Sequence, residues 1–167
     1  MPYAAFTIDR KTRESLLAIF PPKYSEISLD HITIQYPCDD ESVLFEPKSV
    51  AIEGYIDDGA GIEALLVRVD GDIFKSNGLP WHITLSLEKD KQAPDHLIDT
   101  ALSDKTNYAP VMSNTLIKLA LDKSRGNYAI EYLDEPITIN VSSAILGQPE
   151  THSQEPYSDA TPAPHAN

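Results

Sequence analysis

Two stretches rich in β-branched residues, 49–56 and 62–69, flank the turn sequence Asp57-Asp58-Gly59. Aspartate followed by glycine between two such stretches is a strong signal for a β-hairpin, because glycine readily adopts the positive φ that tight hairpin turns need. The pattern predicts an antiparallel pair of strands in the middle of the chain. Further strands are expected at 3–8, 27–36, 81–87, 116–121, 128–132 and 137–145.

Helices are expected at two places between these strands. The first covers about 12–20, with Asp9 or Thr12 as its N-cap, and it ends at Pro21 because proline cannot continue the hydrogen-bond ladder. The second covers about 95–102. The sequence therefore predicts an α+β fold, with mainly antiparallel sheet in two pseudo-symmetric lobes around a central cleft and two or three peripheral helices.

The length of 167 residues suits one domain with a buried core, which we assign to residues 1–146. The composition changes after this point, since residues 148–167 contain four prolines and neither lysine nor arginine. Such a segment buries too little apolar surface to offset the entropy lost on ordering. We therefore expect an acidic, proline-rich, disordered tail over 147–167.

The chain carries 26 acidic and 13 basic side chains, which gives a net charge of −13. This charge argues against binding of long duplex nucleic acid, which needs a basic surface, but a small phosphate ligand needs only local donors. The single cysteine, Cys38, excludes an intrachain disulfide. No secretory signal pattern and no apolar run near the about 18 residues of a membrane span is present, so we expect a soluble, cytoplasmic protein without membrane contact.

One tetrapeptide pattern occurs twice, as His-Ile-Thr-Ile at 31–34 and His-Ile-Thr-Leu at 82–85. Because side chains alternate between the two faces of a strand, each copy buries its apolar residues and presents an imidazole and a hydroxyl on the other face. A single strand histidine is usually structural, but the matched pair favours one shared site. The candidate catalytic residues are His31, Thr33, His82 and Thr84.

This constellation suits a phosphate group. Hydroxyls donate hydrogen bonds to phosphate oxygens, and imidazoles titrate near neutrality, where they act as general acid and general base. The two tetrapeptides resemble the motifs of the two-histidine (2H) phosphoesterase superfamily, and the arrangement of the segments around them is most similar to its small Swiss Army Knife RNA-repair-type branch. The resemblance implies catalysis without metal or cofactor, in which one histidine activates water and the other protonates the leaving oxygen. It leaves open which histidine has which role.

Other residues are candidates for binding the substrate. Tyr3 can stack on a base or be a core residue, and Ser86 extends the polar face that begins at His82. Lys75 belongs to a loop that can close over a phosphate or simply be solvated. Ser113 and Asn114 belong to a segment similar to one that follows the second motif in the family, and they also suit a turn.

The leading hypothesis is a phosphodiesterase that acts on 2′,3′-cyclic phosphate ends of RNA, or on small or cyclic oligonucleotides, in RNA processing. A metal-dependent hydrolase or oxygenase is a second class, which the hydroxyls argue against because a metal site needs carboxylates at such positions. A third is a non-enzymatic β-rich module that binds nucleotides or a protein.

Overall fold

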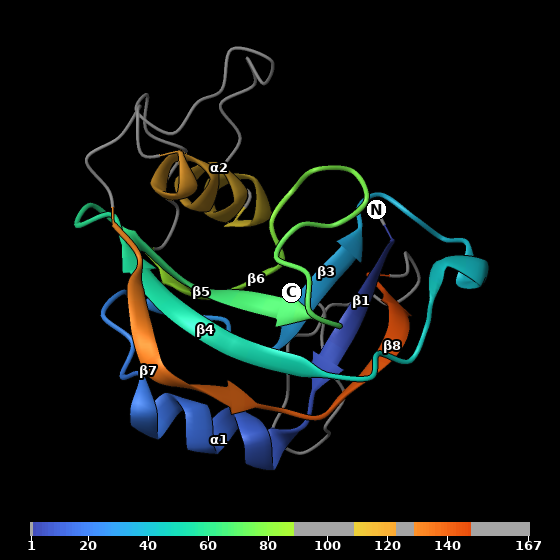
Figure 1. Cartoon of the computed structure of the whole chain (residues 1–167), viewed down its shortest axis with the longest axis horizontal. Coiled ribbons are helices and arrows are strands. Elements are labelled where there is room, and N and C mark those ends of the chain that lie inside the picture. Colours follow the sequence, from blue (N-terminus) through green and yellow to red (C-terminus); the bar gives the residue numbers. More distant parts are fainter. Residues whose placement is uncertain (1, 89–108, 123–128, 148–167) are drawn as a thin grey trace.

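The computed structural model describes residues 2–88, 109–122 and 129–147, and within them it contains eight strands in two sheets and two α-helices (Figure 1). All strand pairs in this part of the chain are antiparallel, which confirms the predicted α+β fold with mainly antiparallel sheet. The smaller sheet has the order β3 (His31–Gln35), β1 (Tyr3–Ile8) and β8 (Val141–Leu146). The larger sheet has the order β2 (Glu26–Ile27), β6 (His82–Leu87), β5 (Ile62–Val69), β4 (Val50–Asp57) and β7 (Glu131–Thr138).

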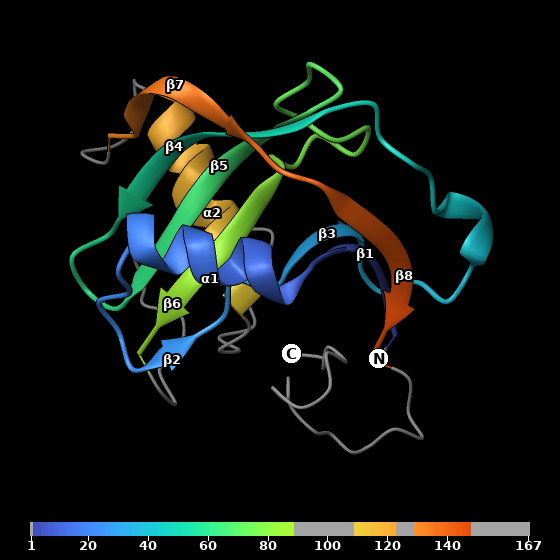
Figure 2. The ribbon, with the colours of Figure 1, turned by 90° about the horizontal axis from the view of Figure 1, so that it is seen from below.

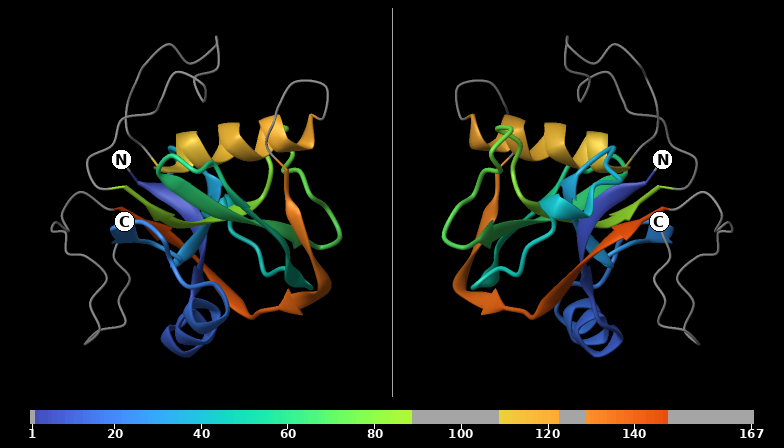
Figure 3. Two further views of the ribbon diagram at one scale, coloured as in Figure 1. Left: turned by 90° about the vertical axis from the view of Figure 1, so that its left-hand side faces the viewer. Right: turned by 90° about the vertical axis from the view of Figure 1, so that its right-hand side faces the viewer.

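The helices α1 (Arg10–Ile19) and α2 (Ala109–Leu121) lie on opposite sides of the larger sheet (Figures 1 and 3). The side chain of Asp9 accepts a hydrogen bond from the backbone N–H of Thr12 at 2.7 Å, so Asp9 is the N-cap of α1. The helix therefore begins two residues earlier than predicted. A short 3-10 helix, η1 (Glu41–Val43), lies between β3 and β4.

The core occupies both faces of the larger sheet. On the α1 side, Leu16 packs with residues of the smaller sheet and with one face of β4, β5 and β6. On the α2 side, a second cluster joins the helix to the opposite face of β5. The buried members of this second cluster are Ile56, Ile62, Ala64, Leu66, Leu87, Leu116, Ile117 and Ala120.

The predicted strand at 116–121 is wrong, because these residues form the second half of α2. Leu116, Ile117 and Ala120 recur at helical spacing and are buried against the sheet. From the sequence alone, an apolar segment this short does not show whether it forms a strand or a buried helix.

The last two strands lie at other bounds than the predicted 128–132 and 137–145. β7 continues through Pro136, which is tolerated because β7 is an edge strand of its sheet. The helix predicted at 95–102 and the tail predicted after Gly147 lie outside the described residues. In the parts of the chain that are described, no helix has the length and apolar character needed to cross a membrane.

The predicted strand at 27–36 is divided between the two sheets (Figure 2). β2 pairs with β6, whereas β3 pairs with β1. Between them, Leu29 has a φ of 58°, in the left-handed region that side chains with a Cβ rarely adopt. The turn at Leu29 carries the chain from the larger sheet into the smaller one and places His31 at the start of β3.

Candidate active site

The two copies of the repeated tetrapeptide lie on β3 and β6, strands of different sheets that contact each other. Before it enters β3, the chain runs along β6: β2 pairs with β6, and the backbone N–H of Leu29 donates to the carbonyl oxygen of Thr84 at 2.8 Å. These pairs follow one antiparallel register. The chain then turns into β3, and the charge of His31 acts on His82, so the histidines of the two copies lie near each other.

His82 is buried, with 4% of its surface exposed. Its Nδ1 lies 3.3 Å from the carbonyl oxygen of Pro80, so Nδ1 carries the proton and Nε2 presents a lone pair. Burial is the largest of the causes that lower the pKa of His82 to about 3, and the charges of Lys75 and His31 lower it further. His82 is therefore neutral at physiological pH, which is the form that accepts a proton.

His31 has a different partner. Its Nδ1 lies 2.8 Å from Oδ1 of Asp30, whose side chain is 8% exposed. A carboxylate oxygen accepts a hydrogen bond at this distance, so the proton of the neutral ring lies on Nδ1 and Nε2 presents a lone pair. The sequence did not point to Asp30, because adjacent strand residues face opposite sides. Asp30 precedes β3, next to the left-handed turn, so that rule does not apply to it.

Both histidines thus keep one ring nitrogen for chemistry. In each ring Nδ1 has a protein partner, and Nε2 makes no hydrogen bond with any group in the described part of the chain. His31 and His82 also differ in environment, since one faces a carboxylate and the other a neutral carbonyl. Such a pair can hold opposite protonation states at one pH, as general acid–base catalysis by two groups requires.

Hydroxyl groups accompany the histidines. Oγ1 of Thr84 lies 2.8 Å from Oγ of Ser113, and both residues are buried. Ser113 lies on α2, so the alternative interpretation of this position as a turn is wrong, and the helix places its hydroxyl beside Thr84 of the second motif. Asn114 follows in the same helix, and its buried Oδ1 has no partner among the described residues. Thr33 is 8% exposed and makes no side-chain hydrogen bond within those residues.

Lys75 supplies a positive charge beside His82. It lies in the loop between β5 and β6, is 9% exposed, and its Nζ lies 5.5 Å from the centroid of the Trp81 ring. Among the described side chains no carboxylate forms an ion pair with Lys75. Burial lowers its pKa from 10.5 to about 8. The expectation of a merely solvated loop is therefore wrong for Lys75, which is buried and electrostatically coupled to His82.

The ring of Tyr3 packs against the ring of His31. The centroids of the two rings are 5.3 Å apart, and the exposed ring of Tyr36 lies 5.7 Å from Tyr3. Burial, with the nearby charge of Asp30 as a smaller cause, raises the pKa of Tyr3, so its hydroxyl stays protonated. Tyr3 is 7% exposed and is thus both a core residue and a neighbour of the site.

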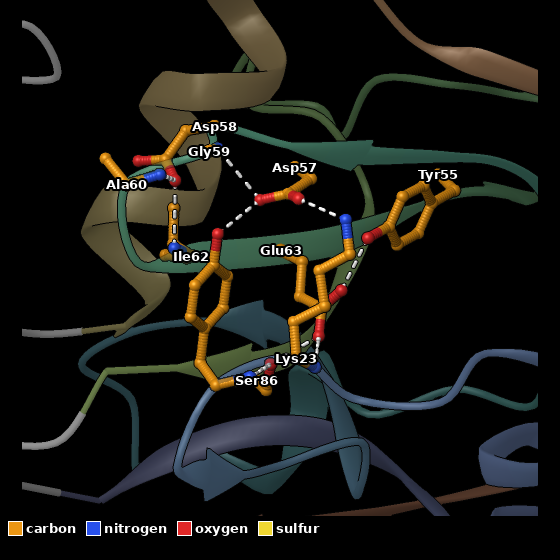
Figure 4. Close-up of polar contacts among 10 residues, drawn as sticks. Lys23, Tyr55, Asp57, Asp58, Gly59, Ala60, Ile62, Glu63 and Ser86 are labelled. Carbon is orange, nitrogen blue, oxygen red and sulfur yellow. Dashed lines mark hydrogen bonds and ion pairs between the residues drawn. The ribbon is translucent and has the colours of Figure 1, made fainter.

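Ser86 does not lie with the other candidates. The register between β5 and β6 shifts beside it: Glu63 is opposite Ser86, whereas the next residue of β5, Ala64, is opposite Thr84. The extra residue, Leu85, forms a β-bulge that changes the alternation, so the prediction that Ser86 shares a face with Thr84 is wrong. Ser86 is fully buried and donates a hydrogen bond to Glu63 (Figure 4).

Glu63 is a fully buried carboxylate that the sequence did not single out. It also accepts hydrogen bonds from the Tyr55 hydroxyl at 2.5 Å and from the backbone N–H of Lys23 at 2.6 Å (Figure 4). Nearby, Asp57 binds the Lys23 ammonium and the Tyr24 hydroxyl. These contacts tie the segment after α1 to β4, β5 and the bulged part of β6.

No group of three or more histidine, cysteine, aspartate or glutamate side chains within the described ranges is arranged to hold a metal ion. Comparisons of the chain with protein-family models, with curated proteins and with solved structures gave no match.

Proposed function

We propose that this chain is a phosphodiesterase of the two-histidine type that uses no metal ion. The observation that carries the proposal is the pair of histidines from two sheets, each with Nδ1 hydrogen-bonded and with Nε2 making no hydrogen bond to the described residues. In the proposed reaction, one histidine takes a proton from the attacking water and the other gives a proton to the leaving oxygen. The hydroxyls of Thr33 and Thr84 bind the phosphoryl oxygens as negative charge builds up.

The substrates we propose are 2′,3′-cyclic phosphate ends of RNA, or small or cyclic oligonucleotides, in RNA processing in the cytoplasm. The buried ammonium of Lys75 supplies a local positive charge for one phosphodiester. The net charge of −13 repels a long strand outside the site, which favours small substrates over long nucleic acid. The exposed ring of Tyr36, which packs on Tyr3, offers a face on which a base can stack near His31.

The test is hydrolysis of nucleoside 2′,3′-cyclic phosphates and cyclic oligonucleotides by the full chain, with EDTA present. We expect turnover, and we expect His31→Ala and His82→Ala each to lower kcat/KM by about 10²-fold or more. Lys48→Met, which changes an exposed residue outside the site, is the control and retains wild-type rates.

Three outcomes contradict the proposal. Unchanged rates in both histidine variants reject the catalytic assignment, and loss of activity in EDTA indicates a metal enzyme. Nucleotide binding without turnover by the wild type indicates a binding module.

A further inference from the structure

Helix α2 packs on the face of the larger sheet that carries the second motif. Thr84 of β6 lies opposite Ala64 of β5, and residues directly opposite each other in an antiparallel pair point to the same face. Ala64 belongs to the apolar cluster that joins α2 to the sheet (Figure 1). The side chain of Thr84 therefore faces α2, and so does that of His82, two residues earlier in the same strand.

Ser113 is a polar residue on the buried face of α2. The other buried residues of this face follow it at helical spacing and are apolar: Leu116, Ile117 and Ala120. The side chain of Ser113 is fully buried, and its Oγ lies 2.8 Å from Oγ1 of Thr84. This is the only side-chain hydrogen bond that either hydroxyl makes to the described residues. A polar side chain at an apolar position of the helix thus contacts the second motif.

A bound phosphodiester would fix the direction of this hydrogen bond. A hydroxyl has one proton to donate and two lone pairs that accept. The contact between Ser113 and Thr84 uses one proton, and either hydroxyl can be the donor. The non-bridging oxygens of a phosphodiester carry no proton and only accept hydrogen bonds. If Thr84 donates its single proton to such an oxygen, the proton between the two hydroxyls must come from Ser113.

We propose that Ser113 is a positioning residue, which donates to Oγ1 of Thr84 and so directs the Thr84 proton at a phosphoryl oxygen of the substrate. This inference rests on the proposed function. A hydroxyl that accepts a hydrogen bond is a stronger donor, because successive hydrogen bonds polarise one another. Helix α2 therefore helps to bind the phosphoryl group without touching it. Thr33, the hydroxyl of the first motif, has no such partner in the described part of the chain.

A double-mutant cycle tests whether Ser113 acts through Thr84. The assay is hydrolysis of a nucleoside 2′,3′-cyclic phosphate by the full chain. We expect Ser113→Ala to lower kcat/KM about tenfold, and Thr84→Val, which replaces the hydroxyl by a methyl group, to lower it about 10²-fold. In the Thr84→Val background, Ser113→Ala should change kcat/KM by less than about twofold, because the hydroxyl it directs is gone. In the Thr33→Val background, which keeps Thr84, it should still cost about tenfold.

Sulfur in place of a non-bridging oxygen gives a second readout, which a purely structural role would not move. Sulfur is a weaker hydrogen-bond acceptor than oxygen. The wild type should therefore hydrolyse one diastereomer of the cyclic phosphorothioate more slowly, the one whose sulfur faces Thr84. This loss should shrink in Ser113→Ala and in Thr84→Val with the same diastereomer, and it should persist in Thr33→Val.

The control is Ser49→Ala, which removes an exposed hydroxyl outside the site and should keep wild-type rates. Urea denaturation of each variant shows that the rates belong to folded protein. The inference is overturned if Ser113→Ala costs the same in the wild-type, Thr84→Val and Thr33→Val backgrounds, if it costs nothing, or if the sulfur effect is unchanged. These results leave the wild type an active enzyme. If the wild type hydrolyses no cyclic phosphate, the proposed function has failed, and the role of Ser113 falls with it.

Discussion

Lys75→Met is expected to stabilise the protein while weakening its proposed activity. The ammonium of Lys75 is buried without a carboxylate partner in the described part of the chain, and burial lowers its pKa from 10.5 to about 8. Holding the charge inside the fold at pH 7 therefore costs about 3 kcal/mol, at about 1.4 kcal/mol per pH unit. Methionine keeps most of the apolar stem against Trp81 and removes the charge.

The pH dependence of this effect follows from proton linkage. Between about pH 8 and 10.5, the unfolded chain holds the lysine proton more tightly than the folded protein does, so the stability of the wild type rises with pH. Below pH 8 the whole penalty is present. The advantage of Lys75→Met should therefore be about 3 kcal/mol at pH 7 and fall below about 1 kcal/mol at pH 10.

Urea denaturation of the wild type and of Lys75→Met at both pH values measures this difference, with Lys48→Met as the control for an exposed lysine. The KM for the cyclic phosphate should rise about tenfold in Lys75→Met, because a charged hydrogen bond to the phosphate is lost. The account of Lys75 as a buried, uncompensated cation would be refuted if Lys75→Met were less stable than the wild type at pH 7. It would also be refuted if the difference in free energy of unfolding between the two proteins were the same at both pH values.

Two further predictions concern the support of the site. Glu63→Ala removes the acceptor of three hydrogen bonds and should cost about 3–5 kcal/mol in urea denaturation. The isosteric Glu63→Gln should cost less, and a loss below about 1 kcal/mol for the alanine variant would show that the network does not hold β6. Asp9→Ala removes the N-cap of α1 and should lower the stability by about 1 kcal/mol, whereas Asp9→Asn should be close to wild type; equal effects of the two would contradict the capping role.

The sequence predicted the strands of the repeat because their signal is local. Ile32 and Ile83 alternate with polar residues, and both isoleucines are fully buried in the core, as strand periodicity requires. The hairpin of β4 and β5 could be predicted for the same reason, because its turn and its two strands lie next to each other in the chain.

The supporting residues escaped prediction because non-local contacts determine their positions. Asp30 reaches His31 only through the left-handed backbone of Leu29, and Ser86 changes face only through a bulge that the pairing with β5 creates. Lys75 is buried because the loop between β5 and β6 places it against Trp81, and the sequence around either residue does not indicate this contact. Periodicity describes one strand at a time and contains no information about such breaks between strands.

The charges of the site explain how so acidic a protein can accept a phosphate. In the proposed working state the charge of one protonated ring is offset by the Asp30 carboxylate and the other ring is neutral, so the Lys75 ammonium is the remaining positive charge. A phosphodiester carries one negative charge, which neutralises the positive charge of Lys75. The attraction between the two charges is stronger because the site is buried. Hydrolysis of a cyclic phosphodiester yields a monoester with a second negative charge, which the site does not balance. On the proposed chemistry, the same arrangement therefore binds the substrate and weakens the hold on the product.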